Sequence, residues 1–436
     1  MRRNRLKFIG WVIPAMVLIS CNGRFGAMIP DYSAYNALAP GGLEVTLEHD
    51  FSFEALDGFR GLIHDFNNTN EYGINIKLTS GQSEGKADLR FVASPVAASM
   101  LRRGESIELS PLVYHPVWGL ENRRDDFYRE ARAQTDYWSF SRKITSIPVL
   151  MSAEVLLVNN GILQEYGFSK FPGSWPVMNF LLWKIKNEGL YSGMGMDFSA
   201  DSVIAMINAR GGSILRPGGF SYSFNNPVVN GTLRYIRERS EDLVISGNNT
   251  DYLNQSEFSF GKLLSAFTGP EGIRYYDKLI RAVNPDLNWT TALLPTRRLG
   301  SGLTADCRSS VVITASDSEK QLAAWLFIKW LTSVDVQVRL AGITGSFPAN
   351  FRAAEKIIES PSAAASLPVQ WVSALEKFHK AYKELLPNFS DYPEVSLKFE
   401  GLIEGSQNGD LIWIETWKLN REVKKQRRDE RKKRRE

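Results

Sequence analysis

The sequence predicts an α/β protein of two domains, on three observations. The chain has 436 residues, more than a single hydrophobic core usually serves. Short strand patterns alternate with amphipathic helix patterns over most of its length, which is typical of sheets covered by helices. Its composition, 43% hydrophobic and 23% charged, is that of a folded globular protein.

The N-terminus carries a short apolar segment behind a basic start. MRRNRLK precedes the run 8–20, which is shorter than the roughly 20 apolar residues that cross a bilayer. A basic start and a short apolar run are typical of a secretory signal peptide. The run ends in Leu-Ile-Ser before Cys21, an order that resembles a bacterial lipobox, whose cysteine is lipidated after cleavage. We expect a signal peptide over 1–20 and lipid on Cys21; an uncleaved anchor or a chance cysteine is the alternative.

The net charge of +4 conceals three regions of different sign. The first 20 residues carry four basic side chains, and residues 418–436 carry 11 basic against 4 acidic ones, so 21–417 has a net charge of −7. An acidic globular part predicts no nucleic-acid partner. We expect 21–42 to be a flexible tether and 418–436 a basic helical tail, either solvated or in contact with anionic lipid.

The elements of the first half follow from side-chain periodicity. Residues 43–49 alternate apolar and polar side chains, as a half-buried strand does. Apolar residues fall at helical spacing over 54–70, which predicts one buried helix face. Further strands are expected at 74–80 and 87–93, helices at 95–103 and from about 121, two strands over 144–159 with a turn at Pro148, and helices at 161–167 and 174–189.

The same alternation continues to the C-terminus. Strands are expected at 193–199, 263–269, 291–295 and 309–315, and helices at 201–209, 228–241, 318–333, 334–342, 348–360, 369–386 and from 392 onward. Four tryptophans on apolar helix faces are expected in the core: Trp175, Trp183, Trp325 and Trp330.

Four passages, in this order, resemble the extracellular solute-binding proteins of ATP-driven importers, in the branch that includes maltose-binding protein. The block 146–175 has a strand with proline, a strand ending in Asn, a short helix, a Gly, and a Trp that opens the next helix. The other passages are an early helix and strand (54–79), the Phe-x-x-Gly-Lys region (258–269), and an Ala-Trp helix before Thr-Gly-x-x-Pro (323–350).

The resemblance implies a two-lobe periplasmic-binding-protein fold of the class II type, with lobes joined by crossing hinge strands and a ligand cleft between them. One lobe would comprise 43–150 plus about 315–360, and the other 151–314 plus part of 361–417. The implied function is a monomeric, lipid-anchored receptor on the extracytoplasmic face. It would capture a carbohydrate or polyol by lobe closure and deliver it to ABC permease subunits. The alternative is an envelope interaction or sensory lipoprotein that keeps the fold without transport.

The sequence contains no pattern typical of catalysis. Its four histidines stand apart, and it has no Gly-x-Ser-x-Gly elbow and no phosphate-binding loop of the Gly-x-x-x-x-Gly-Lys type. Two cysteines among scattered histidines also argue against a zinc site. We therefore expect no enzymatic activity, no metal and no cofactor.

A sugar site needs aromatic rings for the apolar faces of the ring and polar side chains for its hydroxyls. Such residues are expected where strands end at the cleft: Asp50, Phe51, Gln82, Ser94, Trp138, Ser152, Gly211, Glu271 and Asp306, with Glu154, Thr304 and Arg308 beside the last strands. Many relatives place an aromatic after the glycine equivalent to Gly269, where this chain has Pro270 and Glu271. Either a large flat sugar does not lie on that wall, or the stacking moves to Trp138 or Phe51.

Overall fold

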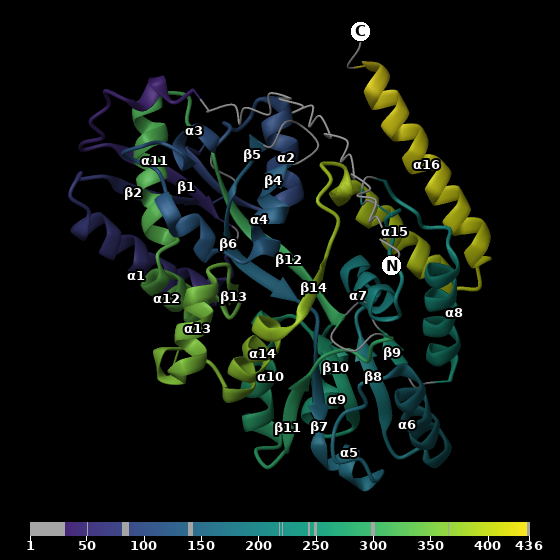
Figure 1. The fold of residues 1–436 in the computed structure, drawn as a ribbon. Helices are drawn as coiled ribbons and strands as arrows, with labels where there is room; N and C mark the ends of the chain where they lie inside the picture. The colour runs from purple at the N-terminus through teal and green to yellow at the C-terminus, as the bar shows by residue number, and fades with distance from the viewer. Residues whose placement is uncertain are drawn as a thin grey trace, which may run out of the picture.

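The structure, a computed structural model, describes residues 31–49, 51–80, 87–137, 143–217, 219, 221–242, 245–247, 251–297, 301–364 and 366–433. Over these residues the chain forms two α/β lobes, each built around its own sheet, as the sequence predicts (Figure 1). Lipidation of Cys21 and the signal peptide over 1–20 lie outside the described residues. No helix within them is long and apolar enough to span a membrane.

The first lobe contains a seven-stranded sheet over the described residues. Its order is β13-β6-β12-β3-β1-β2, with β14 beside β12. β1 runs parallel to β2 and β3, whereas β12 is antiparallel to β3 and β6. The strands are β1 (Glu44–His49), β2 (Asn75–Ser80), β3 (Leu89–Val92), β6 (Ile147–Ala153), β12 (Ser301–Ile313), β13 (Phe347–Pro348) and β14 (Tyr382–Leu385).

Helices with one apolar face cover this sheet. Phe59, Leu62 and Phe66 lie three and four residues apart on α1 and are buried together, as the pattern predicts. The helices are α1 (Phe53–Thr69), α2 (Ser94–Arg103), α3 (Ser110–Val113), α4 (Arg129–Thr135), α11 (Ser318–Leu331), α12 (Val334–Thr344) and α13 (Phe351–Glu359). Smaller elements are η1 (Ser33–Tyr35), η2 (Glu121–Asp126), η3 (Pro361–Ala364), β4 (Asp136–Tyr137) and β5 (Lys143–Ile144).

The second lobe contains a five-stranded sheet over the described residues, in the order β11-β7-β10-β8-β9. Its strands are β7 (Val155–Asn159), β8 (Ser192–Met196), β9 (Ile245–Gly247), β10 (Leu263–Thr268) and β11 (Trp289–Ala292). The helices around it are α5 (Asn160–Glu165), α6 (Trp175–Glu188), α7 (Ala200–Ala209), α8 (Pro227–Glu241), α9 (Asp251–Ser259), α10 (Pro270–Val283) and α14 (Val369–Lys380).

Two strand-to-strand connections carry the chain between the lobes. β6 of the first sheet passes into β7 of the second with only Glu154 between them, and β11 of the second sheet leads back to β12 of the first. β12 lies in the first sheet along its whole length, although we had expected residues up to 314 in the second lobe. The reason is that β12 pairs with strands of the first sheet throughout: with β14 over 301–305, with β6 over 305–311 through an irregular ladder, and with β3 over 310–313.

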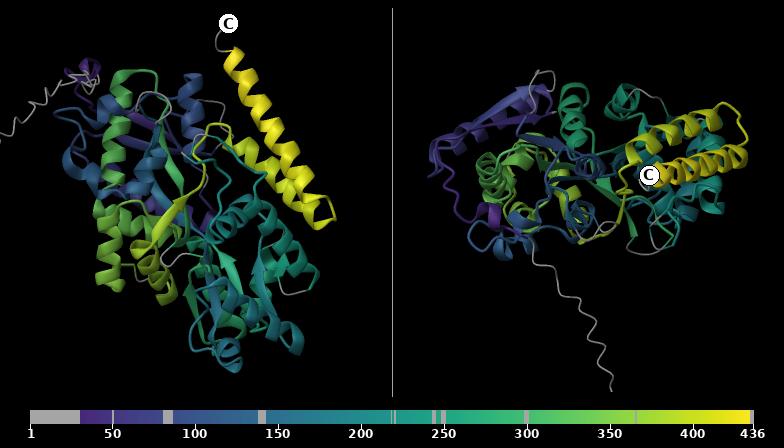
Figure 2. Two further views of the ribbon diagram at one scale, coloured as in Figure 1. Left: turned by 45° about the vertical axis from the view of Figure 1, so that its right-hand side comes forward. Right: turned by 90° about the horizontal axis from the view of Figure 1, so that it is seen from above.

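The C-terminal helices α15 (Tyr392–Gln407) and α16 (Ile412–Lys433) lie side by side and pack on α7 and α8 (Figure 2). Ile412, Leu419 and Val423 of α16 are buried in the core of the second lobe. The far end of α16 reaches the first lobe, where Glu430 and Arg102 of α2 approach to 3.6 Å.

The expectation of a flexible tether over 21–42 is wrong for its described end. Tyr35 is 6% exposed in the core of the first lobe, and its hydroxyl donates to Gln321 Oε1 at 2.7 Å.

Three further local expectations are wrong. Pro148 lies inside β6 rather than in a turn; an irregularity of the β6–β12 ladder falls beside it, where a residue without an N–H is tolerated. The predicted helix 369–386 ends at Lys380, and β14 follows it beside β12. Trp183 is 56% exposed, because the core face of α6 is formed by Met178, Leu182 and Ile185. Trp325 and Trp175 are buried as expected.

Candidate functional site

The crossing strands place polar residues of the first lobe at the boundary between the lobes. Ser152 on β6 is the register partner of Asp306 on β12, and the Glu154 N–H donates to the Thr304 carbonyl at 3.3 Å. Alternate residues of a strand point to the same face, which groups Thr304 with Asp306, and Arg308 follows where the β6–β12 ladder is irregular. These five side chains line a small cavity with Ala153, Asp201 and Leu386.

The second lobe contributes two carboxylates from the first turns of helices. Asp201 lies in the first turn of α7 and Glu271 in the first turn of α10. The positive end of the helix dipole favours a carboxylate in this position. The Tyr392 hydroxyl of α15 donates to Asp201 Oδ1 at 2.9 Å, so the Asp201 carboxylate is held in place.

Glu271 joins the two lobes at this point. Its Oε1 lies 3.2 Å from Arg308 Nη1, and its carboxylate accepts from Ser152 Oγ at 3.3 and 3.4 Å. A second contact between the lobes lies nearby, where Asn208 Nδ2 of α7 donates to Thr304 Oγ1 at 3.0 Å. Polar side chains of both lobes therefore meet directly at the crossing strands.

Burial of several carboxyl groups together changes their protonation. Burial raises the pKa of Glu154 to about 8, and the negative charges of Asp197 and Asp201 act in the same direction. Burial likewise raises the pKa of Asp306 to about 7, and the pKa of Asp201 is also raised, again mainly by burial. Near neutral pH the Glu154 and Asp306 carboxyl groups hold protons part of the time, so the site offers donors as well as acceptors.

The groups that meet at the site can donate and accept hydrogen bonds. Carboxyl, hydroxyl, amide and guanidinium groups converge here from β6, β12, α7 and α10. Across the part of the chain that the structure describes, no group of three His, Cys, Asp or Glu side chains is arranged to hold a metal ion.

The structure brings three of the expected ligand residues together, namely Ser152, Glu271 and Asp306. Three others lie elsewhere. Phe51 packs against Phe59 and Phe91 in the first core. Ser94 is fully buried and donates to the Cys307 carbonyl at 3.1 Å, so its hydroxyl is not available to a solute.

The backbone conformation at residue 211 explains why this residue is a glycine. Gly211 follows α7 with φ of +81°, in the left-handed region that favours glycine, and its N–H donates to the Asn208 carbonyl at 2.8 Å. It ends the helix rather than lining the cavity. The remaining expected residues, Asp50, Gln82 and Trp138, lie outside the described part of the chain.

Sequence reasoning missed Asp201, Asn208 and Tyr392. Asp201 had a detectable signal, because it follows a predicted strand and opens a predicted helix, the same arrangement that pointed to Glu271. Asn208 lies at the far end of that helix, and Tyr392 begins a helix almost 200 residues later; no local pattern places either one beside β12.

Comparison with solved structures shows the same fold in three sugar-binding proteins. MalE from the phytopathogen Xanthomonas citri is 16% identical, with a TM-score of 0.72 over 87% of this chain and 96% of that chain. The cyclic α-maltosyl-1,6-maltose binding protein of Arthrobacter globiformis is 18% identical, with a TM-score of 0.69 over 88% and 98%. Maltose-bound MalE3 of T. maritima is 16% identical, with a TM-score of 0.66 over 87% and 99%.

Sequence comparison gives the family directly. No curated protein matches the chain significantly. Residues 63–366, more than half of the chain, match the family described as bacterial extracellular solute-binding protein. The crossing strands, the two lobes and the polar site between them agree with this match. The chain therefore belongs to the bacterial extracellular solute-binding protein family.

Proposed function

We propose that the chain binds a carbohydrate or polyol between its lobes, at the cavity lined by Ser152, Asp306 and Arg308. The observation that carries the proposal is the contact of Glu271 with Arg308 and Ser152, because it joins a helix of the second lobe to the crossing strands. A solute with several hydroxyl groups matches this mixture of donors and acceptors. The chain acts as a binding protein rather than an enzyme, in keeping with its family.

Solved structures of the same fold support the choice of solute. Their names describe binding of maltose, maltotriose and a cyclic maltosyl-maltose. Sugars carry no net charge, and the partly protonated carboxyl groups of Glu154 and Asp306 suit such a ligand, since protonation lowers the cost of burying them.

Binding requires the lobes to separate from the arrangement seen here. The cavity has a volume of about 10 Å³, room for about one water molecule. The lobes also touch beyond the cavity, where Arg274 Nη1 of α10 donates to the Ile343 carbonyl of α12 at 2.7 Å. We propose that opening breaks the Arg308–Glu271 and Arg274–Ile343 contacts, and that closure on the solute follows by hinge motion at the crossing strands.

Because side chains of the two lobes fill the space between them, the structure also favours a second candidate function. An envelope interaction or sensory lipoprotein would keep the fold without feeding a transporter. In such a protein the Arg308–Glu271 pair would be a permanent contact between the lobes rather than one that a solute replaces.

Anchoring and delivery complete the proposal. Lipid on Cys21 would hold the receptor at the extracytoplasmic face of a membrane, and ABC permease subunits would receive the solute. Support comes from the Leu-Ile-Ser-Cys order at 18–21 and from the family, whose members are extracellular solute-binding proteins.

Calorimetric titration of the full chain with oligosaccharides, polyols and amino acids tests solute binding. We expect one carbohydrate or polyol class to bind at one molecule per chain. A solute at 100 times its Kd should then raise the free energy of unfolding by about 2.7 kcal/mol. Arg308→Met should weaken binding by about tenfold or more, because a hydrogen bond to a charged group contributes about 1.5–3 kcal/mol.

Arg339→Met is the matched control, since Arg339 is an exposed arginine of α12 in a single ion pair with Asp65. Equal binding by wild type and Arg308→Met would place the solute elsewhere. A folded chain that binds no carbohydrate or polyol would favour the second candidate function.

The raised carboxyl pKa values predict a pH dependence of stability. The pKa of Glu154 is 4.5 in its ordinary state and about 8 in the folded chain, and that of Asp306 is 3.8 and about 7. At a pH between these values, the folded state binds more protons than the unfolded chain. The free energy of unfolding therefore falls as pH rises from about 5 to 8. Replacing both groups, by Glu154→Gln and Asp306→Asn, should make thermal stability less dependent on pH across this window.

The control for this experiment replaces an exposed pair of the same types, Glu44→Gln with Asp335→Asn, whose side chains are 50% and 80% exposed. Melting temperatures measured from pH 5 to 8 would contradict the account if the Glu154/Asp306 variant had the same slope as wild type.

Lipid anchoring is tested by Cys21→Ala in a bacterial host that processes lipoproteins. The variant should lose incorporation of labelled fatty acid and leave the membrane fraction, because the thiol that accepts the lipid is gone. Asn22→Ala, at the neighbouring position, should keep both properties. Unchanged labelling of Cys21→Ala would rule out this anchor.

A further inference from the structure

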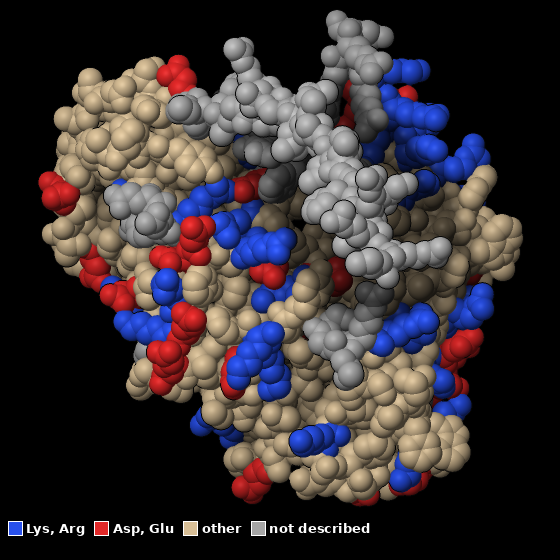
Figure 3. All heavy atoms as spheres, viewed as in Figure 1, with Lys and Arg blue, Asp and Glu red and all other residues tan. Residues whose placement is uncertain are grey.

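A second cavity lies between α16 and the residues Arg216, Ser221 and Tyr222, away from the crossing strands. It has a volume of about 250 Å³, far larger than the cavity at the lobe boundary. Among the described residues, its lining contains four basic side chains and no acidic one: Arg216, Ser221, Tyr222, Asn420, Val423, Lys424, Arg427 and Arg428. Lysine and arginine side chains gather along α16 over this part of the surface (Figure 3).

α16 is a firmly packed wall of this cavity. Ile412, Leu419 and Val423 recur at seven- and four-residue spacing and are 6%, 5% and 2% exposed. Their burial fixes the side of the helix that faces the lobe. The basic residues Lys424, Arg427 and Arg428 follow directly after Val423, so they project from a helix whose orientation is fixed. A solvated end would present them in no fixed arrangement.

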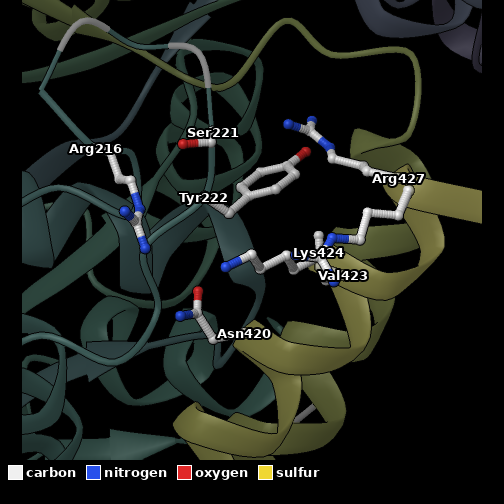
Figure 4. Close-up of a pocket in the computed structure, with 8 residues that line it drawn as sticks. Arg216, Ser221, Tyr222, Asn420, Val423, Lys424 and Arg427 are labelled. Carbon is white, nitrogen blue, oxygen red and sulfur yellow. The ribbon is translucent and has the colours of Figure 1, made fainter. Parts of the chain in front are cut away.

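The opposite wall is also held in place. The Arg216 N–H donates to the Ser221 carbonyl at 2.8 Å, and the Gly219 N–H donates to the Arg216 carbonyl at 2.9 Å. The Phe224 N–H donates to Asn420 Oδ1 at 3.3 Å, which ties the wall to α16 and leaves the Asn420 amide nitrogen to act as a donor. Figure 4 shows Arg216 from this wall and Lys424 and Asn420 from α16 extending toward one another.

Charge compensation differs among the four basic residues. Arg427 donates to both oxygens of the buried Asp391, at 2.6 and 2.8 Å, and its guanidinium lies 4.2 Å from the centre of the Phe389 ring and 4.4 Å from that of Tyr222. Arg216, Lys424 and Arg428 have no ion pair with any described residue. Three positive charges thus share one cavity with no carboxylate in its lining.

We propose that this cavity binds a phosphate group. Guanidinium and ammonium donors from two walls, with an amide and a hydroxyl beside them, match the several oxygens of a phosphate. An anion there would relieve the mutual repulsion of Arg216, Lys424 and Arg428. The volume admits a phosphate with part of the molecule that carries it, which is either a soluble phosphate ester or the head group of an anionic phospholipid.

The test compares two double variants of the full chain in a phosphate-free buffer at about 0.15 M salt, where long-range attraction is screened. Arg216→Met with Lys424→Met removes two cations from the cavity. Arg421→Met with Lys425→Met removes the same residue types from exposed positions of α16 outside the cavity lining. Both variants change the net charge equally, so any difference between them reports on the cavity.

Two probes separate the sources of the phosphate. Titration with inorganic phosphate and glycerol phosphate detects a soluble ligand, and flotation with phosphatidylcholine vesicles, with or without phosphatidylglycerol, detects a lipid head group. We expect at least one probe to bind wild type, and the cavity variant to bind it tenfold or more weakly while the control variant binds as wild type does. Binding to a soluble phosphate identifies the first source, and binding only to phosphatidylglycerol vesicles identifies the second.

Two results would overturn the proposal. One is the absence of binding to either probe by the folded wild-type chain. The other is an equal loss of binding in the two double variants, which would show that net charge alone attracts the anion. Melting temperatures of both variants near that of wild type establish that a loss is not caused by unfolding, as expected for exposed substitutions.

Discussion

The pairing of β6 with β12 is the constraint on which the rest of this structure depends. These strands lie next to each other in the first sheet. β6 passes into β7 of the second sheet across Glu154 alone, and β12 follows β11 of the second sheet after residues 293–300. Their register sets Ser152 opposite Asp306 and Ala153 opposite Ala305. Since a shift of one residue would turn every side chain to the other face, this register decides which residues meet at the lobe boundary.

The same place explains why half-buried carboxyl groups are tolerated at the lobe boundary. Glu154, Asp201 and Asp306 gather around one guanidinium, that of Arg308, which is a costly arrangement if every carboxyl is ionised. Raised pKa values reduce the cost because the groups take up protons. A solute with neutral hydroxyls would then exchange hydrogen bonds with groups that are already partly neutral, and lobe opening would expose these groups to water.

Much of the fold could be predicted from the sequence, because the patterns are local. The apolar spacing that predicts helix 318–333 is observed as α11, from Ser318 to Leu331, and the α/β alternation gave the architecture. The failures share a cause, which is tertiary context. β14 forms beside β12 because β12 offers an unpaired edge there, and Trp183 is exposed because other residues of α6 face the core.

For the site, the sequence pattern identified some of the side chains that meet at the lobe boundary, and their contact with a solute stays a prediction. Glu271 follows β10, as expected, whereas Asp306 lies inside the long strand β12 rather than before a strand that begins at 309. Asp201, Asn208 and Tyr392 reach the same place through helix packing that no spacing in the sequence specifies. The basic tail differs from the site. Its positive charge was evident in the sequence, but its packing on the second lobe was not, because Leu419 and Val423, which are buried there, are two apolar residues among many basic ones.

The central claim is that a solute closes the two lobes over the crossing strands. The most direct measurement is the distance between spin labels at Lys77→Cys on β2 and Lys186→Cys on α6, both exposed positions, one on each lobe. We expect a broad distribution without solute and a narrower, shorter one at saturation with the carbohydrate or polyol that binds. An unchanged distribution with the solute bound would contradict the account, because binding would then occur without closure.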